Sequence, residues 1–115
     1  MEDLIIGDLQ IWPQSLGKIR MTWYEAMVEV TKLGPGWRLP TIEEFKETLY
    51  PNRSGILGLT DDYYWSSTEY DNYDAMTFLF FNGTANLTNK YSTNYVRAVR
   101  DFSGEIALDL LLKDF

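Results

Sequence analysis

The sequence predicts an α+β fold in which two helices come early in the chain and mostly antiparallel strands follow. Capping-box signatures at 22–25 and 41–44 each precede a run with helical periodicity. From residue 63 onward aromatic and β-branched residues predominate, and an Asn-Gly pair at 82–83 joins two of the runs, which is the strongest short signal of a β-hairpin. Early helices followed by late strands are typical of the α+β class.

The first half of the chain is expected to hold one strand, two helices and a connection. Residues 4–12 carry β-branched and aromatic side chains and precede a proline, so they predict an opening strand. The first capping box predicts a helix over 22–33 that a glycine ends, and the second predicts a shorter helix over 42–49 that a proline ends. Residues 52–62 are rich in Gly and Asp without a sustained period, which predicts a surface connection.

The second half is expected to be strands. The aromatic run 63–67 predicts one strand, the segments 75–81 and 84–88 predict a hairpin around the Asn-Gly pair, and 95–102 predicts a further strand. The apolar tail 106–112 alternates with period two but also suits one face of a helix, so its type stays open.

Size and composition limit both the architecture and the chemistry. The 115 residues, 45% of them hydrophobic, suffice for a single domain over 1–115 with one compact core. The chain contains no Cys and no His, which excludes Cys/His zinc sites, thiol nucleophiles and Ser-His-Asp relays. We therefore expect no cofactor and no metal.

Charge and hydropathy limit the partners. The formal net charge of −7 disfavours binding to nucleic acid, because a polyanion would be repelled. No run approaches the roughly 20 apolar residues of a membrane span, so no membrane insertion is expected. The acidic start Met1-Glu2-Asp3 is unlike a secretory signal, which predicts a cytoplasmic or virion-associated protein if Met1 is the native start.

Carboxylates are the remaining catalytic candidates, since a pair of Asp or Glu residues suffices for glycoside hydrolysis. Asp61, Asp62, Asp71 and Asp74 qualify by residue type. Adjacent acids on a surface loop are, however, usually solvated. A carboxylate-based hydrolase is thus an alternative function, and it requires two of these acids to meet across a cleft.

The segment 70–95 differs in composition from the rest of the chain. Its 26 residues include five Asn, four Tyr and four Thr but no Glu, Gln or Trp. Strand alternation over 75–81 places Met76, Phe78 and Phe80 on one face and the odd-numbered residues on the other. Either both faces are covered, or one face displays apolar side chains that can contact a partner.

Three motifs in order resemble a known family. They are Gly-Trp-Arg-Leu-Pro-Thr at 36–41, Tyr-Trp-Ser-Ser-Thr-Glu at 64–69 and Val-Arg-Ala-Val-Arg at 96–100. Together they resemble bacterial and phage domains of C-type-lectin-like fold, related to the formylglycine-generating-enzyme-like group, over about residues 4–102. The resemblance implies a C-type-lectin-like fold, with Trp37, Arg38, Trp65, Arg97 and Arg100 holding it together.

A subset of that fold is the variable protein of diversity-generating retroelements, which this sequence resembles in its Trp-Ser-Ser-Thr-Glu frame, Asn-rich hairpin and closing Val-Arg-Ala-Val-Arg. In such proteins Asn codons are mutated at adenines, which cannot yield Lys, Glu, Gln, Met or Trp. The resemblance implies a variable region at about 65–100, with Met76, Phe78, Phe80, Ala85 and Lys90 as fixed scaffold. Leu87 and Asn89 stay unassigned. The implied variable, ligand-binding residues are Tyr70, Asp71, Tyr73, Asp74, Thr77, Leu79, Phe81, Thr84, Asn86, Thr88, Tyr91, Ser92, Thr93 and Asn94.

The leading hypothesis is a non-catalytic ligand-binding module with a hypervariable recognition surface. The expected ligand is a protein or a cell-surface receptor. Tyrosines would supply contact area and Asp71 and Asp74 would select cationic partners. A second alternative is a small structural or assembly protein of a phage or mobile element, which forms a homo-oligomer through the 106–112 tail. The leading hypothesis requires Leu79 and Phe81 to face water.

Overall fold

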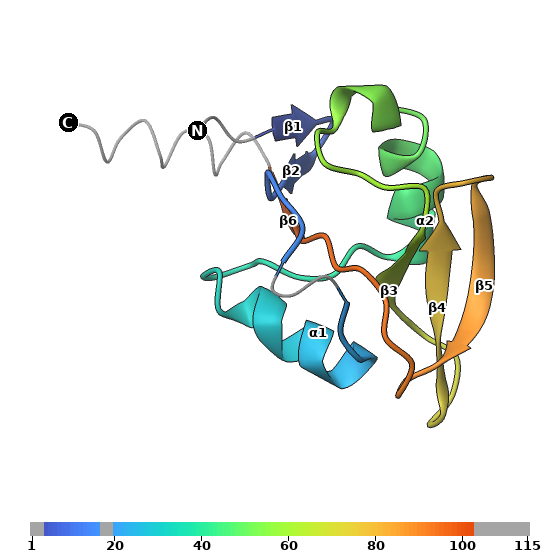
Figure 1. The fold of residues 1–115 in the computed structure, drawn as a ribbon. Helices are drawn as coiled ribbons and strands as arrows, with labels where there is room; N and C mark the ends of the chain where they lie inside the picture. Colours follow the sequence, from blue (N-terminus) through green and yellow to red (C-terminus); the bar gives the residue numbers. More distant parts are fainter. Residues whose placement is uncertain (1–3, 17–19, 103–115) are drawn as a thin grey trace.

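The computed structural model describes residues 4–16 and 20–102, and the 106–112 tail lies outside the described residues. Within them the chain is mostly β: two three-stranded antiparallel sheets accompany only short helices. The predicted α+β fold with two N-terminal helices is therefore wrong (Figure 1). No helix in the described ranges is long and apolar enough to cross a membrane.

The first sheet joins the beginning and the end of the described chain. It has the order β1-β2-β6, with β1 at Leu4–Ile6, β2 at Leu9–Ile11 and β6 at Val99–Asp101. The single strand predicted over 4–12 is a hairpin instead, because Gly7 takes a positive φ of 60° and reverses the chain. The strand predicted over 95–102 is paired in a sheet only within β6.

The second sheet carries most of the segment of unusual composition. Its order is β3-β4-β5, with β3 at Tyr63–Glu69, β4 at Asp74–Leu79 and β5 at Thr84–Asn89. The hairpin predicted around 82–83 forms as β4 and β5, which pair along their whole length. In Figure 1 this sheet stands along one side of the molecule with β5 at its outer edge.

The first helix agrees with the sequence prediction. Helix α1 runs over Trp23–Thr31, and both hydrogen bonds of the capping box form: the Thr22 hydroxyl accepts from the Glu25 backbone and the Glu25 carboxylate accepts from the Thr22 backbone. Trp23, Ala26 and Val30 form its buried face.

The second predicted helix, over 42–49, is not one α-helix. Its capping box forms at Thr41, but α2 covers only Ile42–Glu44 and continues as a π-helical turn over Phe45–Leu49. The wider turn arises because the backbone N–H of Tyr50 donates to the carbonyl of Phe45, five residues back, at 2.8 Å. Phe45 and Leu49 are both buried in this turn, so burial of these side chains accompanies the departure from α geometry.

Two hydrophobic clusters pack on opposite sides of β3. Tyr64 belongs to the cluster that contains Phe45 and Phe78, and the next residue, Trp65, belongs to the cluster that contains Trp23. Because successive side chains of a strand point to opposite faces, β3 is buried on both faces. The edge strand β5 is more exposed, with Thr84, Leu87 and Asn89 all facing solvent.

Candidate ligand-binding surface

The β4-β5 register brings five of the predicted binding residues onto one face of the hairpin. Thr77 lies opposite Asn86, Leu79 lies opposite Thr84, and Ala75 lies opposite Thr88. Because directly opposed residues share a face, Thr77, Leu79, Thr84, Asn86 and Thr88 form one surface, which we call the hairpin face. The hairpin face is continuous across both strands.

Burial varies across the hairpin face. Thr84 is exposed, and Leu79, Asn86 and Thr88 are half-buried. Thr77 is fully buried, and its hydroxyl lies 2.9 Å from that of Thr88, within hydrogen-bonding distance. The expectation that Thr77 is displayed is therefore wrong: on the central strand β4 it lies directly opposite Trp65 of β3 and Asn86 of β5, whose side chains share its face.

The opposite face of the hairpin packs into the core. Phe78 is buried and stacks on Phe45 with ring centroids 5.4 Å apart. Phe80, which follows β4, is also buried and meets Phe45 edge-on. Phe81 at the hairpin tip is exposed, so neither Leu79 nor Phe81 is sealed in the interior.

The remaining predicted residues gather at the other end of the sheet, in the loops 70–74 and 90–94, which we call the loop end. Its tyrosines are strongly exposed: Tyr70 by 65%, Tyr73 by 74% and Tyr91 by 76%. Asp71, Ser92 and Thr93 are exposed, and Asp74 is half-buried.

Asn94 departs from the expectation that it is displayed. Its side chain is buried and its Nδ2 has no hydrogen-bond partner. The backbone of Asn94 forms a two-way bridge with Met21, which draws the residue against the rest of the domain. A contact between segments so far apart in sequence leaves no local signal.

Lys90 joins the two loops of the loop end. Its side chain is only 2% exposed, and its Nζ donates to Glu69 Oε2 at 2.5 Å and to the Asp71 carbonyl at 2.7 Å. The ammonium also lies 4.7 Å from the ring centroid of Trp23. A buried ammonium requires such partners, since an unpaired charge is costly to bury. Lys90 thus fixes both loops to α1 and β3.

The four candidate catalytic acids do not form one group. Asp61 and Asp62 precede β3 and Asp71 and Asp74 follow it, and seven residues of strand span roughly 20 Å. Asp62 pairs with Arg20 at 2.7 Å, and Asp71 Oδ1 accepts from the backbone N–H groups of Tyr73 and Asp74. Across 4–16 and 20–102 no cluster of three or more acidic side chains could hold a metal ion.

Comparison with protein families adds an independent observation. A model of the Lcl C-terminal domain family matches residues 9–100, which is most of the chain. The chain belongs to the Lcl C-terminal domain family. This family is a C-type-lectin-like binding domain, and its match contains both the hairpin face and the loop end. No curated protein matches the sequence.

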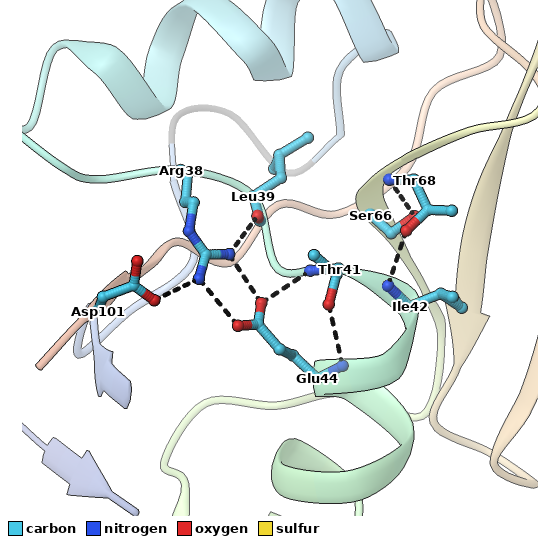
Figure 2. Close-up of polar contacts among 8 residues, drawn as sticks. All are labelled: Arg38, Leu39, Thr41, Ile42, Glu44, Ser66, Thr68 and Asp101. Atoms are coloured by element: carbon cyan, nitrogen blue, oxygen red, sulfur yellow. Dashed lines mark hydrogen bonds and ion pairs between the residues drawn. The ribbon is translucent and has the colours of Figure 1, made fainter. Parts of the chain in front are cut away.

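In this Lcl C-terminal domain an ion-pair cluster connects the segment before α2, α2 itself and β6. Figure 2 shows Arg38 donating to both carboxylate oxygens of Glu44, at 2.7 and 2.8 Å, and to Asp101 at 2.7 Å. The hydrogen bonds to Glu44 raise the pKa of Arg38 above its ordinary value, against the opposing effect of burial. Burial would raise the pKa of Glu44, but the hydrogen bonds from Arg38 and Thr41 hold it below its ordinary value.

The second motif holds α2 against β3. The Thr68 hydroxyl oxygen accepts the backbone N–H of Ile42 at 2.9 Å, and the Thr68 backbone N–H donates to the Ser66 hydroxyl at 3.1 Å (Figure 2). Ser66 in turn donates to the Met76 carbonyl on β4. The first N–H groups of a helix have no hydrogen-bond partner within the helix. At α2, the Thr68 hydroxyl accepts one of them in place of a water molecule.

The third motif contributes one buried arginine, Arg97, and one half-buried arginine, Arg100. Arg97 is buried and donates from Nε to the Trp12 carbonyl at 2.7 Å, and burial lowers its pKa. Arg100 donates to Gln10 and lies over the Trp37 ring, 4.9 Å from its centroid. In the Lcl C-terminal domain both arginines therefore contact the scaffold and neither lies in the exposed surface.

Proposed function

We propose that this Lcl C-terminal domain is a non-catalytic ligand-binding module whose recognition surface consists of the exposed and half-buried residues of the loop end and of the hairpin face, together with Phe81. The supporting observation is the exposure of Tyr70, Tyr73, Phe81 and Tyr91 beside strands that bury Tyr64, Trp65 and Phe78. Exposed clusters of large aromatic residues mark interaction surfaces, and tyrosine gives much contact area for little loss of rotamer entropy. The ligand is a protein, such as a cell-surface receptor.

A display experiment tests the recognition surface. One library randomises the exposed and half-buried predicted residues and keeps Thr77, Lys90 and Asn94 fixed. A matched library of equal size randomises exposed positions elsewhere, including Val28, Glu47 and Leu57. Both are selected against the same panel of bacterial surface proteins. The proposal expects specific binders from the first library at a clearly higher frequency, and equal frequencies would contradict it.

We further propose that a retroelement diversifies this surface at about residues 65–100. The support is the compositional bias of residues 70–95 together with the burial of Phe78, Phe80 and Lys90. The resemblance to variable proteins implies that these three residues are fixed scaffold. Sequencing the encoding locus tests this. A near-copy of codons 65–100 with Asn codons at the exposed positions, next to a reverse-transcriptase gene, is expected. A locus without such a copy would overturn the diversification and leave the binding proposal intact.

A further inference from the structure

We propose that Tyr24, on the fixed helix α1, completes a site at the loop end that binds an arginine or lysine side chain of a protein partner. This inference rests on the proposed binding function and names its chemistry. Tyr24 lies outside the segment of unusual composition, so nothing in the sequence joins it to the recognition surface. The site consists of Tyr24, Tyr73, Tyr91, Asp71 and Asp74.

The first step is the contact between the helix and the loop. The rings of Tyr24 and Tyr91 have centroids 5.5 Å apart and an interplanar angle of 47°. Tyr24 is 43% exposed although its ring also contacts those of Tyr91 and Trp23. A solvent-facing ring surface therefore extends from the loop end onto α1.

The second step is that this arrangement is fixed before any partner binds. The Trp23 backbone N–H donates to the Lys90 carbonyl at 3.1 Å, and its indole Nε1 donates to the Ser66 carbonyl at 3.0 Å. The capping box at Thr22 sets the first turn of the helix. Because the start of α1 is bonded to the residue before Tyr91, little ordering entropy is lost when the paired rings bind a ligand.

The third step is the charge at the site. The loop end carries the carboxylates Asp71 and Asp74, and its one ammonium, Lys90, is buried and already paired with Glu69 at the end of β3. The backbone of Tyr73 is fixed next to that of Lys90, because the Tyr73 carbonyl accepts the Lys90 backbone N–H at 2.9 Å. A cation over tyrosine faces and beside carboxylates gains from both, whereas an anion or a second copy of a chain with net charge −7 is repelled. The occupant is therefore a cationic protein segment.

An NMR titration tests the site with a defined probe. The full chain, labelled with 15N and with 13C in its aromatic rings, is titrated with tetra-arginine peptide and separately with tetra-citrulline peptide, which has the same shape without charge. The proposal expects saturable shifts of the Tyr24, Tyr73 and Tyr91 ring signals with the arginine peptide alone. Shifts spread evenly over acidic positions such as Asp61 and Glu47 would show only diffuse charge attraction and would overturn it.

Three variants isolate the contribution of Tyr24. Tyr24→Ala should weaken binding of the arginine peptide about two- to five-fold, the range expected for an exposed cation–π contact. Tyr24→Phe keeps the ring and should restore it. Tyr63→Ala removes an exposed tyrosine at the opposite end of β3 and should leave the affinity unchanged.

The outcomes separate this inference from the proposed function. Equal affinity of the Tyr24→Ala variant and the unchanged chain would overturn the role of Tyr24, even if the display libraries yield binders at the loop end. Failure of the libraries would overturn the recognition surface itself, whatever the arginine peptide does. A well-dispersed NMR spectrum of each variant shows that any loss is not a loss of folding.

Discussion

Lys90 is a residue whose scaffold role was implied by sequence resemblance and whose partners are visible only in the structure. The resemblance to variable proteins implied that it is scaffold, and the structure places its ammonium in the interior between Glu69, Asp71 and Trp23. Sequence position alone gave no indication of these partners, because Trp23 lies on α1 while Glu69 and Asp71 lie at and just after the end of β3, about twenty positions or more from Lys90.

Replacing Lys90 by Met should lower the free energy of unfolding. The substitution removes two charge-assisted hydrogen bonds from a buried site, for which we expect a loss of about 2–4 kcal/mol. Urea denaturation measures it. The matched control is Lys32→Met, which breaks the exposed pair with Glu29 and should cost less than about 0.5 kcal/mol. Equal losses in the two variants would contradict the role given to Lys90.

Glu44 should make stability depend on acid pH. Its pKa lies below the ordinary value of 4.5 in the folded chain, so the unfolded chain binds the proton more readily. The stabilisation is therefore complete above the unfolded pKa and is lost as the pH falls through the folded pKa.

The Glu44→Gln variant checks this pH dependence. It should be less stable than the unchanged chain at pH 7 and should lose less stability between pH 7 and about pH 3, because its side chain does not titrate. Urea midpoints at the two pH values measure both effects. Glu47→Gln, at an exposed position of the next turn, should keep the acid dependence of the unchanged chain. An unaltered pH profile in Glu44→Gln would contradict the argument.

At the scale of elements, local sequence signals predicted where helices begin and where the hairpin turns better than they predicted how far the helices extend. The capping boxes at Thr22 and Thr41 both form, and the Asn-Gly pair does turn the β4-β5 hairpin. The α-helical hydrogen-bond pattern that begins at Thr41 nevertheless changes to a π-helical turn in the segment that buries Phe45 and Leu49. Capping chemistry is local, whereas the pitch of a short helix also depends on what it packs against.

The hairpin turn should tolerate no side chain at Gly83. Its φ is +72°, and a Cβ atom there would lie 2.6 Å from the Tyr50 ring. Gly83→Ala should therefore destabilise the chain by about 1–3 kcal/mol, through backbone strain and the displaced ring. Gly55→Ala is the control, because a Cβ there meets nothing within 4 Å. Thermal unfolding compares the two, and a neutral Gly83→Ala would refute the required contact.

At the scale of the whole molecule, the side chains that stabilise the fold differ from those proposed for recognition. The aromatic residues of the two clusters hold the sheets and helices together, while the exposed ones at the loop end and hairpin tip contact little of the fold. A surface that can be changed without unfolding the domain requires this separation.

The triple variant Tyr73→Ser, Phe81→Ser, Tyr91→Ser tests the separation. Because all three side chains are exposed, the combined loss of unfolding free energy should stay below about 1.5 kcal/mol. The single variant Trp65→Ala, in the core, should lose about 3–5 kcal/mol. Urea denaturation measures both. A triple variant as unstable as Trp65→Ala would mean that the exposed aromatics support the fold.

The sequence by itself determined the local features of this protein: the first helix, both capping boxes, the β4-β5 hairpin, and the alternation that separates Phe78 from Leu79. Each of these depends on residues a few positions apart. The same kind of information cannot tell which strand is central or which helix meets which loop. It therefore missed the burial of Thr77 and the contact of Tyr24 with Tyr91.

Only the tertiary structure decided those points, because they depend on groups distant in sequence. Thr77 is flanked on its face by the side chains of Trp65 and Asn86 from the two neighbouring strands, and Tyr24 joins the loop end because Trp23 is bonded to Lys90. Alternation gives a side chain its direction, and packing gives it its neighbours. The proposed recognition surface thus depends on packing between segments that are far apart in the sequence.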